Sequence, residues 1–185
     1  MRIKLILLDF DGTLASTEDA NMEAYVLALR EEGIELDTEE YRRRYFGMRC
    51  PEFLRELGIT NESDIDRIRR RKIELYPTRF GSVHLNEPLW NFVQDMRKQG
   101  VKAWIVSTGQ KDNIENAMRY LGIMEGVYGI LTSGDVSEPK PSPAAFLKAM
   151  EIEGVTPAET LIFEDSPVGI AAAEASGAAY FKVKL

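Results

Sequence analysis

The sequence predicts an α/β fold in which a doubly wound parallel-sheet core carries an inserted, all-helical cap. Three observations support this prediction. Short apolar runs of strand length alternate with helical patterns after about residue 86. A similar run, Leu5–Leu8, opens the chain, and the segment between the two regions shows only helical patterns. Because alternating strands and helices build parallel sheets with right-handed crossovers, we expect a core from residues 1–15 and 86–185 and a cap from residues 16–85.

Each expected core strand is a short apolar run bounded by polar or turn residues. These runs are Leu5–Leu8, Val101–Val106, Tyr128–Leu131, Thr160–Phe163 and Ala179–Val183. The helices expected between them run from Pro88 to Gly100, Lys111 to Leu121, Pro143 to Met150 and Pro167 to Ser176. Several begin with proline or end at glycine, which are the usual signals of helix ends.

The expected cap contains helical patterns only. Ser16 and Asp19 resemble a capping pair ahead of its first expected helix, which ends at Gly33. The other cap helices are expected at about 37–47, 51–57 and 63–76. Because the cap leaves the core directly after the first strand, we expect it to act as a lid that excludes water from a site at the end of that strand.

Composition and charge limit the possible partners and location. The 185 residues are 44% apolar and 29% charged, and the formal net charge is −7. This negative charge disfavours binding to nucleic acid or to an anionic membrane surface. The single cysteine, Cys50, rules out an internal disulfide and fits a reducing compartment, and no apolar segment approaches the length of a membrane span. We therefore expect a cytoplasmic, monomeric protein with no membrane or nucleic-acid partner.

Polar residues follow the expected strands at the ends where α/β sheets bind their ligands. They are two acids, a Ser-Thr-Gly turn, a lysine between prolines and a second pair of acids: Asp9 and Asp11, Ser107, Thr108 and Gly109, Lys140, Glu164 and Asp165. Each alone has an ordinary explanation as a turn, an exposed loop lysine or a helix N-cap. Because a parallel sheet brings these ends to one edge, their coincidence favours a functional site.

This set of side chains suits phosphoryl transfer. Carboxylates are the ligands that Mg²⁺ prefers, together with waters and a substrate phosphate. Lys140 and the metal would neutralise charge on the transferred phosphoryl group. One aspartate beside the metal can attack phosphorus and form an aspartyl phosphate, and the second can protonate the leaving oxygen and then activate water. Ser107 and the amides near Thr108 and Gly109 can donate hydrogen bonds to the same oxygens.

Four segments resemble, in order, the four motifs of the haloacid dehalogenase (HAD) superfamily. They are Asp9–Leu14, Ser107, Lys140–Pro143 and Phe163–Ser166. The resemblance covers the whole chain, because the helical insert resembles the first-position cap of that family. It is nearest to the branch of phosphoglycolate phosphatases and β-phosphoglucomutases, and it implies a Rossmann-like core.

The resemblance implies a role for each motif residue. It implies Asp9 as nucleophile and Asp11 as general acid/base, with Ser107 and Lys140 at the phosphate site. The Mg²⁺ ligands that it implies are the side chains of Asp9 and Asp165 and the carbonyl of Asp11, with Glu164 as a nearby acid. The expected activity is the Mg²⁺-dependent hydrolysis of a phosphate monoester of a small metabolite.

Two alternatives to a phosphatase are open. A phosphohexomutase of this family would carry a histidine in the linker after the first motif, where this chain has Asn21, and often a valine where it has Thr13. A phospho-accepting signalling module would also place acids, a hydroxyl and a lysine on a parallel sheet, but it would need no helical insert. Glucose 6-phosphate formed from the 1-phosphate would identify the mutase, and a long-lived phosphoprotein without turnover would identify the module.

Three cap residues are candidates for recognising the part of the substrate that is not transferred. Arg49 lies in a predicted loop between cap helices, where relatives place substrate-contacting residues. Thr17 matches a threonine of the linker in this family, and Glu18 follows it. The other cap arginines are interleaved with Asp and Glu, so we expect them on solvated helix faces.

Overall fold

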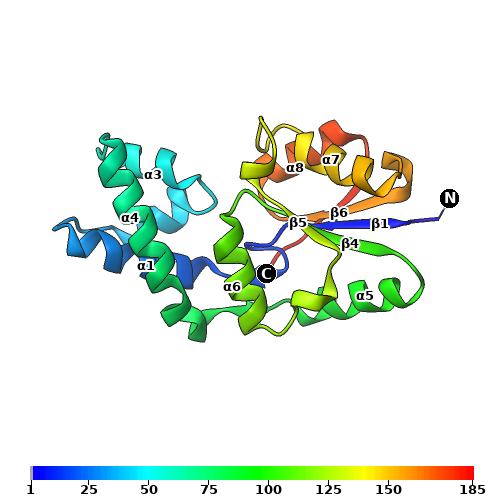
Figure 1. Ribbon diagram of the computed structural model, residues 1–185, viewed down its shortest axis with the longest axis horizontal. Coiled ribbons are helices and arrows are strands. Elements are labelled where there is room, and N and C mark those ends of the chain that lie inside the picture. Colours follow the sequence, from blue (N-terminus) through cyan, green and yellow to red (C-terminus); the bar gives the residue numbers. More distant parts are fainter. Residues whose placement is uncertain (1) are drawn as a thin grey trace. The chain divides into compact units, whose positions relative to one another are not determined.

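The computed structural model describes residues 2–185, which form two compact units (Figure 1). The core unit consists of the chain up to Ser16 together with His84–Leu185, and the helical unit consists of Thr17–Val83. Each unit has its own cluster of buried apolar side chains. No helix of the described chain is both long and apolar enough to cross a bilayer.

A five-stranded parallel sheet forms the centre of the core unit, in the order β5-β4-β1-β6-β7. Its strands are β1 (Leu5–Leu8), β4 (Lys102–Val106), β5 (Gly129–Leu131), β6 (Thr160–Glu164) and β7 (Ala179–Lys182). β1 pairs with β4 on one side and with β6 on the other, and its side chains are fully buried. A central parallel strand is covered on both faces, which explains its unbroken apolar run. The prediction of a doubly wound α/β fold is confirmed.

Helices cover both faces of this sheet. They are α5 (Glu87–Lys98), α6 (Lys111–Tyr120), α7 (Ala144–Glu153) and α8 (Pro167–Ser176). α5 and α6 lie on one face, and α7 and α8 lie on the other (Figure 1). Right-handed crossovers produce this division when the chain winds outward from β1, first in one direction and then in the other.

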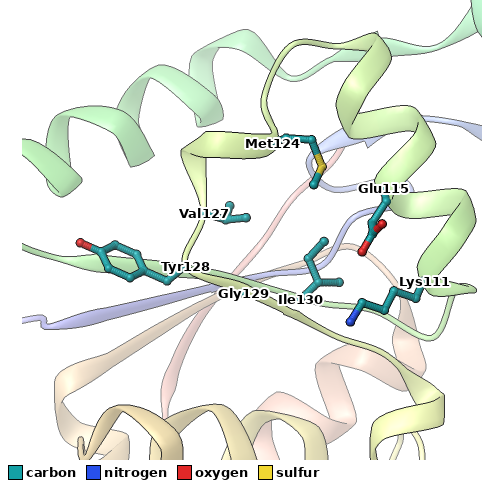
Figure 2. A pocket seen from close by; sticks show the side chains of 7 residues that line it. All are labelled: Lys111, Glu115, Met124, Val127, Tyr128, Gly129 and Ile130. Carbon is teal, nitrogen blue, oxygen red and sulfur yellow. The ribbon is translucent and has the colours of Figure 1, made fainter.

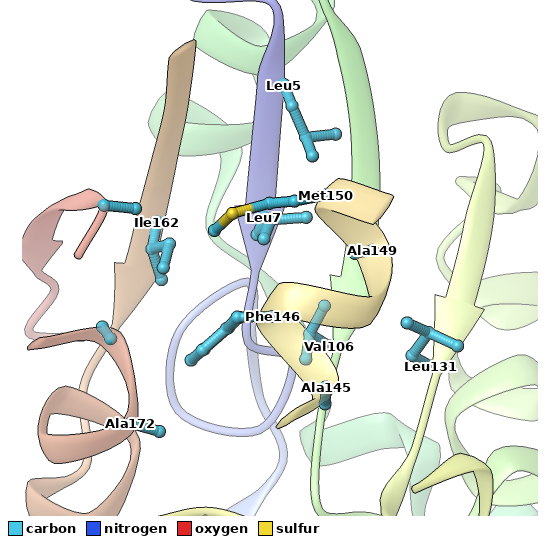
Figure 3. Packing of buried hydrophobic residues seen from close by; sticks show 12 residues of the cluster. Leu5, Leu7, Val106, Leu131, Ala145, Phe146, Ala149, Met150, Ile162 and Ala172 are labelled. Atoms are coloured by element: carbon cyan, nitrogen blue, oxygen red, sulfur yellow. The ribbon is translucent and has the colours of Figure 1, made fainter. Parts of the chain in front are cut away.

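The apolar core on the α7 face is built around two side chains of that helix. Phe146 and Met150 belong to one buried cluster with Leu7 of β1, Ile162 of β6 and Ala172 of α8 (Figure 3). The small residues of α8 let this helix approach the sheet closely. This cluster fixes α7 and α8 over β1, which Asp9 follows, and over β6, which ends in Glu164.

Phe146→Ala is expected to destabilise the protein by about 3–5 kcal/mol, because it removes a fully buried ring and leaves a cavity. The Tm should fall by roughly 10 °C in thermal denaturation followed by circular dichroism. Leu147→Ala is the control, since this neighbouring side chain on α7 is 42% exposed. If the two variants unfolded at the same temperature, the core would not depend on α7 as described.

The helical unit packs around a cluster of aromatic rings. Its elements are α1 (Glu18–Glu31), α2 (Thr38–Glu40), a π-helical turn (Tyr41–Tyr45), α3 (Cys50–Glu56), α4 (Glu62–Leu75) and a 3₁₀ segment (Tyr76–Ser82). The ring of Phe53 lies 5.5 Å from that of Tyr41 and 5.0 Å from that of Tyr45, between centroids. The segment predicted as a helix over 37–47 is helical from Thr38 to Tyr45, but it changes from an α-helix to a wider π-helical turn at Tyr41 and ends before Gly47.

A charged side chain is also buried inside the helical unit. Lys72 of α4 is 3% exposed, and its ammonium donates a hydrogen bond to Asn21 Oδ1 at 2.6 Å. The same ammonium lies 4.1 Å from the centroid of the Tyr76 ring. Arginines of the unit lie instead on its surface, as expected, and pair with acids, for example Arg67 with Glu32 at 2.7 Å.

Two short strands, which the sequence analysis missed, lie at the two ends of the helical insert. β2 (Ala15–Ser16) and β3 (His84–Leu85) pair antiparallel. The expectation that residues 16–85 contain no strand is therefore wrong at both ends, since two-residue strands show no periodicity that a sequence pattern could reveal. The backbone N–H of Asn86 donates to the carbonyl of Leu14 at 2.8 Å and ties this ribbon to the loop after β1.

Candidate active site

The carboxyl ends of β1, β4 and β6 carry polar residues that the sequence singles out. Asp9 follows β1, Ser107 follows β4, and Glu164 is the last residue of β6. Lys140 comes from the loop before α7. Because β1 lies between β4 and β6, Asp9 occupies the middle of this edge, which is where doubly wound sheets bind their ligands.

Lys140 is the centre of the site. Its buried ammonium donates hydrogen bonds to Asp9 Oδ1 at 2.7 Å, to Glu164 Oε1 at 2.5 Å and to the carbonyl of Val106 at 2.8 Å. It also lies 5.1 Å from the centroid of the Phe146 ring. Burial alone would lower the pKa of Lys140, but the charges of Asp9 and Glu164 raise it above its ordinary value. The lysine therefore stays protonated.

Asp9 is held in place from both its backbone and its side chain. Its N–H donates to the carbonyl of Phe163 at 3.0 Å, and its side chain is buried against Lys140. Burial raises the pKa of Asp9 well above its ordinary value, with Lys140 acting against this rise and Glu164 adding to it. More negative than positive groups meet here, so the site favours an additional cation.

Both oxygens of Glu164 accept hydrogen bonds. Oε1 accepts from Lys140, while Oε2 accepts from the backbone N–H of Asp165 at 2.8 Å, the N–H of Ser166 at 2.9 Å and the Ser166 hydroxyl at 3.1 Å. These donors belong to the start of α8, where the positive end of the helix dipole also favours a carboxylate. Glu164 therefore connects Lys140 to the first turn of α8.

Asp165 lies against the loop after β1. Its Oδ1 accepts a hydrogen bond from the Thr13 hydroxyl at 2.8 Å. Burial raises the pKa of Asp165, and the Thr13 hydrogen bond opposes this rise. Gly12 has a φ of +86°, and a Cβ on it would overlap the Asp165 carboxylate, so this turn needs glycine for both reasons.

The loop after β4 approaches Asp11. Ser107 is buried, and its Oγ accepts a hydrogen bond from the backbone N–H of Gly109 at 3.0 Å. The carbonyl of Thr108 accepts one from the Ser133 hydroxyl at 3.2 Å, which fixes the loop. A Cβ on Gly109 would lie 3.1 Å from Asp11 Oδ2. The structure thus brings the predicted phosphate-binding loop beside the second aspartate.

Three of the predicted metal-site acids form one group. Each of Asp9, Glu164 and Asp165 offers a carboxylate oxygen within 4.8 Å of the others. Hard oxygen ligands of this kind fit Mg²⁺, which takes one or two carboxylates and completes its shell with waters and phosphate. Because Glu164 already accepts hydrogen bonds at both oxygens, Asp9 and Asp165 are the better placed direct ligands.

The predicted substrate-reading residues belong to the helical unit. Arg49 precedes α3 and makes an ion pair with Glu52 at 3.5 Å. Thr17 is buried directly before α1. Glu18 lies 3.9 Å from Arg42, and burial raises its pKa while Arg42 opposes the rise.

Three contacts that hold the site were missed by the sequence analysis. They are the Val106 carbonyl under Lys140, the Thr13 hydroxyl on Asp165 and the close approach of Glu164 to Gly169 in α8. The first two give no sequence signal, since backbone carbonyls and threonines are common at strand ends. Gly169 does give one, because a glycine inside a helix is costly and indicates a packing reason.

A pocket lies elsewhere in the core unit, beside the edge strand β5 (Figure 2). Lys111 and Glu115 of α6 line it together with Met124, Tyr128 and Ile130. None of the residues predicted for the site lines this pocket. We therefore identify the candidate site from the side chains that converge at the strand ends, and not from this pocket.

Comparison with known proteins identifies the family of this chain. The family model for haloacid dehalogenase-like hydrolases matches residues 6–183. Validoxylamine A 7'-phosphate phosphatase from Streptomyces hygroscopicus subsp. limoneus is 27% identical over 178 residues, which cover 94% of this chain and 82% of that protein. The crystal structure of CbbY from Rhodobacter sphaeroides in complex with phosphate has a TM-score of 0.89 at 26% identity, over 99% of this chain and 87% of that chain.

Two further structures have similar folds. A variant of the same CbbY in complex with xylulose-(1,5)-bisphosphate has a TM-score of 0.88 at 26% identity, over 99% of this chain and 87% of that chain. β-Phosphoglucomutase from Clostridium difficile has a TM-score of 0.82 at 22% identity, over 99% and 85% of the two chains, and so shares the fold. Since the family model covers nearly the whole sequence, including every strand end of the site, the chain belongs to the haloacid dehalogenase-like hydrolase family.

Proposed function

We propose that this hydrolase is a Mg²⁺-dependent phosphatase that cleaves a phosphate monoester of a small metabolite through an aspartyl-phosphate intermediate. The observation that carries the proposal is the buried cluster at the strand ends, where Asp9 and Glu164 share the ammonium of Lys140. Asp165 lies beside them, so three carboxylates but one lysine meet at the strand ends. Such an acid-rich centre suits a divalent cation together with a substrate phosphate, because their charges then balance.

In the proposed reaction, Asp9 attacks the phosphorus of the ester, and the bond from phosphorus to the ester oxygen breaks. Asp11 donates its proton to that oxygen, and the alcohol leaves. Asp11 then takes a proton from a water molecule, which attacks the phosphorus of the aspartyl phosphate and releases inorganic phosphate and free Asp9. Asp9 and Asp11 are two positions apart in one tight loop, so one can attack the phosphorus while the other transfers protons at the same centre.

The other residues are proposed to stabilise charge on the phosphoryl oxygens. Lys140 can neutralise part of it, since its neighbouring acids keep it protonated. Ser107 accepts from Gly109, so its own O–H is oriented to donate elsewhere, and the amides near Thr108 are further donors. When bound between Asp9 and Asp165, Mg²⁺ would supply positive charge that favours the ionised, nucleophilic form of Asp9.

Hydrolysis of p-nitrophenyl phosphate tests the proposal. The purified protein should release p-nitrophenol with Mg²⁺, lose this activity in excess EDTA and regain it when Mg²⁺ is restored. Ca²⁺ is the matched control, because it takes more ligands at longer distances and should support a lower rate. Absence of turnover across a broad panel of phosphate esters with Mg²⁺ would contradict the proposal.

The same panel addresses the substrate class. A small phosphorylated metabolite is supported by the relatives, one named for a 7'-phosphate and one solved with a sugar bisphosphate. Arg49 is proposed to contact the part that is not transferred, since its side chain is 43% exposed and its ion pair with Glu52 is long, at 3.5 Å. Arg49→Ala should then change the order of preferred esters. The cytoplasmic location and the monomeric state stay predictions from the sequence.

Mutase activity is the alternative to test on the same samples. Asn21 stands where the family's mutases are expected to carry histidine, and its amide is held at both ends: Nδ2 donates to the carbonyl of Thr17 at 3.1 Å, and Oδ1 accepts from Lys72. An amide cannot exchange a proton as an imidazole does. We therefore expect no glucose 6-phosphate from β-glucose 1-phosphate in a coupled assay, whereas its formation would favour the mutase.

Thr13→Val is expected to weaken Mg²⁺ activation, because it removes the hydroxyl that orients Asp165 while keeping the shape of the side chain. The Mg²⁺ concentration for half-maximal activity should rise by roughly 10–100-fold. Thr13→Ser retains the hydroxyl and should stay close to the wild type. Equal Mg²⁺ requirements for the Val and Ser variants would show that this hydrogen bond has no part in metal binding.

A further inference from the structure

We propose that Gly169 is a positioning residue for the lysine of the site. Its missing side chain leaves the space in which the carboxylate of Glu164 lies, and that carboxylate holds Lys140 against Asp9. The inference rests on the proposed function, because it assigns Lys140 a part in phosphoryl transfer.

The first step concerns space. Gly169 lies buried in the first turn of α8, and a Cβ on it would overlap the carboxyl carbon and both oxygens of Glu164. Its backbone is helical and has no positive φ, so the conformation itself would accept alanine. The close approach of Glu164 is therefore the reason that this position needs glycine.

The second step concerns the freedom of the carboxylate. Glu164 Oε2 is fixed by the N–H groups of Asp165 and Ser166 and by the Ser166 hydroxyl. Ser166 Oγ in turn accepts the N–H of Gly169 at 3.0 Å, so donors and glycine form one compact turn around the carboxylate. A methyl group at residue 169 would push the carboxylate out of this turn and away from its donors.

The third step leads to Lys140. Its ammonium is held from three sides by Glu164 Oε1 at 2.5 Å, Asp9 Oδ1 at 2.7 Å and the Val106 carbonyl at 2.8 Å. A displaced Glu164 removes one of these three acceptors. The ammonium then loses the geometry in which it faces Asp9, the residue that carries the transferred phosphoryl group in the proposed reaction.

Gly169→Ala is therefore expected to lower kcat for p-nitrophenyl phosphate with Mg²⁺ on the order of 10²-fold, as displacements of about 1 Å at a reacting centre do. The assay is run at 20 °C, below the Tm of each variant. Gly81→Ala is the matched control, because a Cβ there meets no atom within 4 Å and no positive φ is involved. It should keep wild-type kcat.

A double-mutant cycle separates positioning from a general structural effect. Gly169→Ala should lower the Tm of the wild type and of Glu164→Gln, since glutamine fills the same volume as glutamate. In the Glu164→Ala background the overlap is gone, so the same substitution should raise the Tm by about 2–4 °C, as alanine does for a helical glycine. The sign of this Tm effect is measured without an activity assay. The test therefore still works if Gly169→Ala alone folds poorly.

Each outcome is decisive. A Tm effect of the same sign in all three backgrounds would overturn the spatial argument, because it would then not depend on the Glu164 carboxylate. A sign change in Tm combined with unchanged kcat in Gly169→Ala would overturn the positioning of Lys140. Failure of the proposed function itself looks different, since the wild type would then hydrolyse none of the phosphate esters.

Discussion

Asp9→Asn is expected to abolish phosphate-ester hydrolysis, with kcat falling by roughly four to six orders of magnitude, as when other catalytic nucleophiles are removed. The amide has the shape of the carboxylate but cannot attack phosphorus to form the acyl phosphate. The site around it should persist, because Lys140 keeps its bonds to Glu164 and to the Val106 carbonyl. Release of p-nitrophenol with Mg²⁺ measures the loss.

The stability of this variant provides the control. Because burial raises the pKa of Asp9, ionisation of this group works against the folded state as the pH rises above its ordinary value of 3.8. Without metal at neutral pH, the Tm of Asp9→Asn should therefore equal or exceed that of the wild type. Asp95→Asn, at an exposed position of α5, should keep full activity. Wild-type activity in Asp9→Asn would rule out Asp9 as the nucleophile.

Lys140→Met should damage both activity and stability. Methionine has a similar length but no charge, so the buried carboxylates of Asp9 and Glu164 would lose the ammonium that they share. Breaking a buried ion pair by removing one partner costs about 3–5 kcal/mol, which corresponds to a decrease in Tm of roughly 10 °C. The loss of a charged group facing the phosphoryl oxygens should lower kcat by roughly 10²–10³-fold.

Lys98→Met is the matched control, since that lysine lies on the surface of α5 and its ion pair with Asp95 is exposed. It should leave both Tm and kcat near the wild type. Added Mg²⁺ should restore part of the Tm lost in Lys140→Met, because the cation pairs with the same acids and binds only the folded protein. If both lysine variants unfolded together with the wild type, the buried cluster would not contribute to stability.

The parts of the fold with a strong physical pattern were predictable. Leu5–Leu8 was predictable as a buried strand, because it is a short apolar run bounded by polar residues, and the acids at the later strand ends then favoured a site at its end. The alternation of strand and helix patterns after about residue 86 likewise predicted a parallel sheet. It also predicted that the carboxyl ends of the strands meet at one edge of that sheet. These patterns are strong because burial on both faces of a sheet leaves few sequences that can fill its middle.

The details of the site depend on contacts between distant segments, which one sequence does not show. Lys140 was expected at the sheet edge, but its bonds to both Asp9 and Glu164 became visible only in three dimensions. Glu164 had an alternative explanation as part of a helix start, and the structure gives the cap position to Ser166 and leaves Glu164 buried behind it. Thr13 and Asp165 are likewise far apart along the chain yet hydrogen bonded.

The β2–β3 ribbon brings the two ends of the helical insert next to each other. Paired residues of an antiparallel ribbon have Cα atoms about 5 Å apart. The chain therefore leaves the core unit at Ser16 and returns at His84 through two neighbouring positions. A two-residue Asn-Gly turn spans such a gap. An Asn-Gly turn in place of Thr17–Val83 would leave every residue of the five-stranded sheet, and also Asp9 and Lys140, unchanged in sequence.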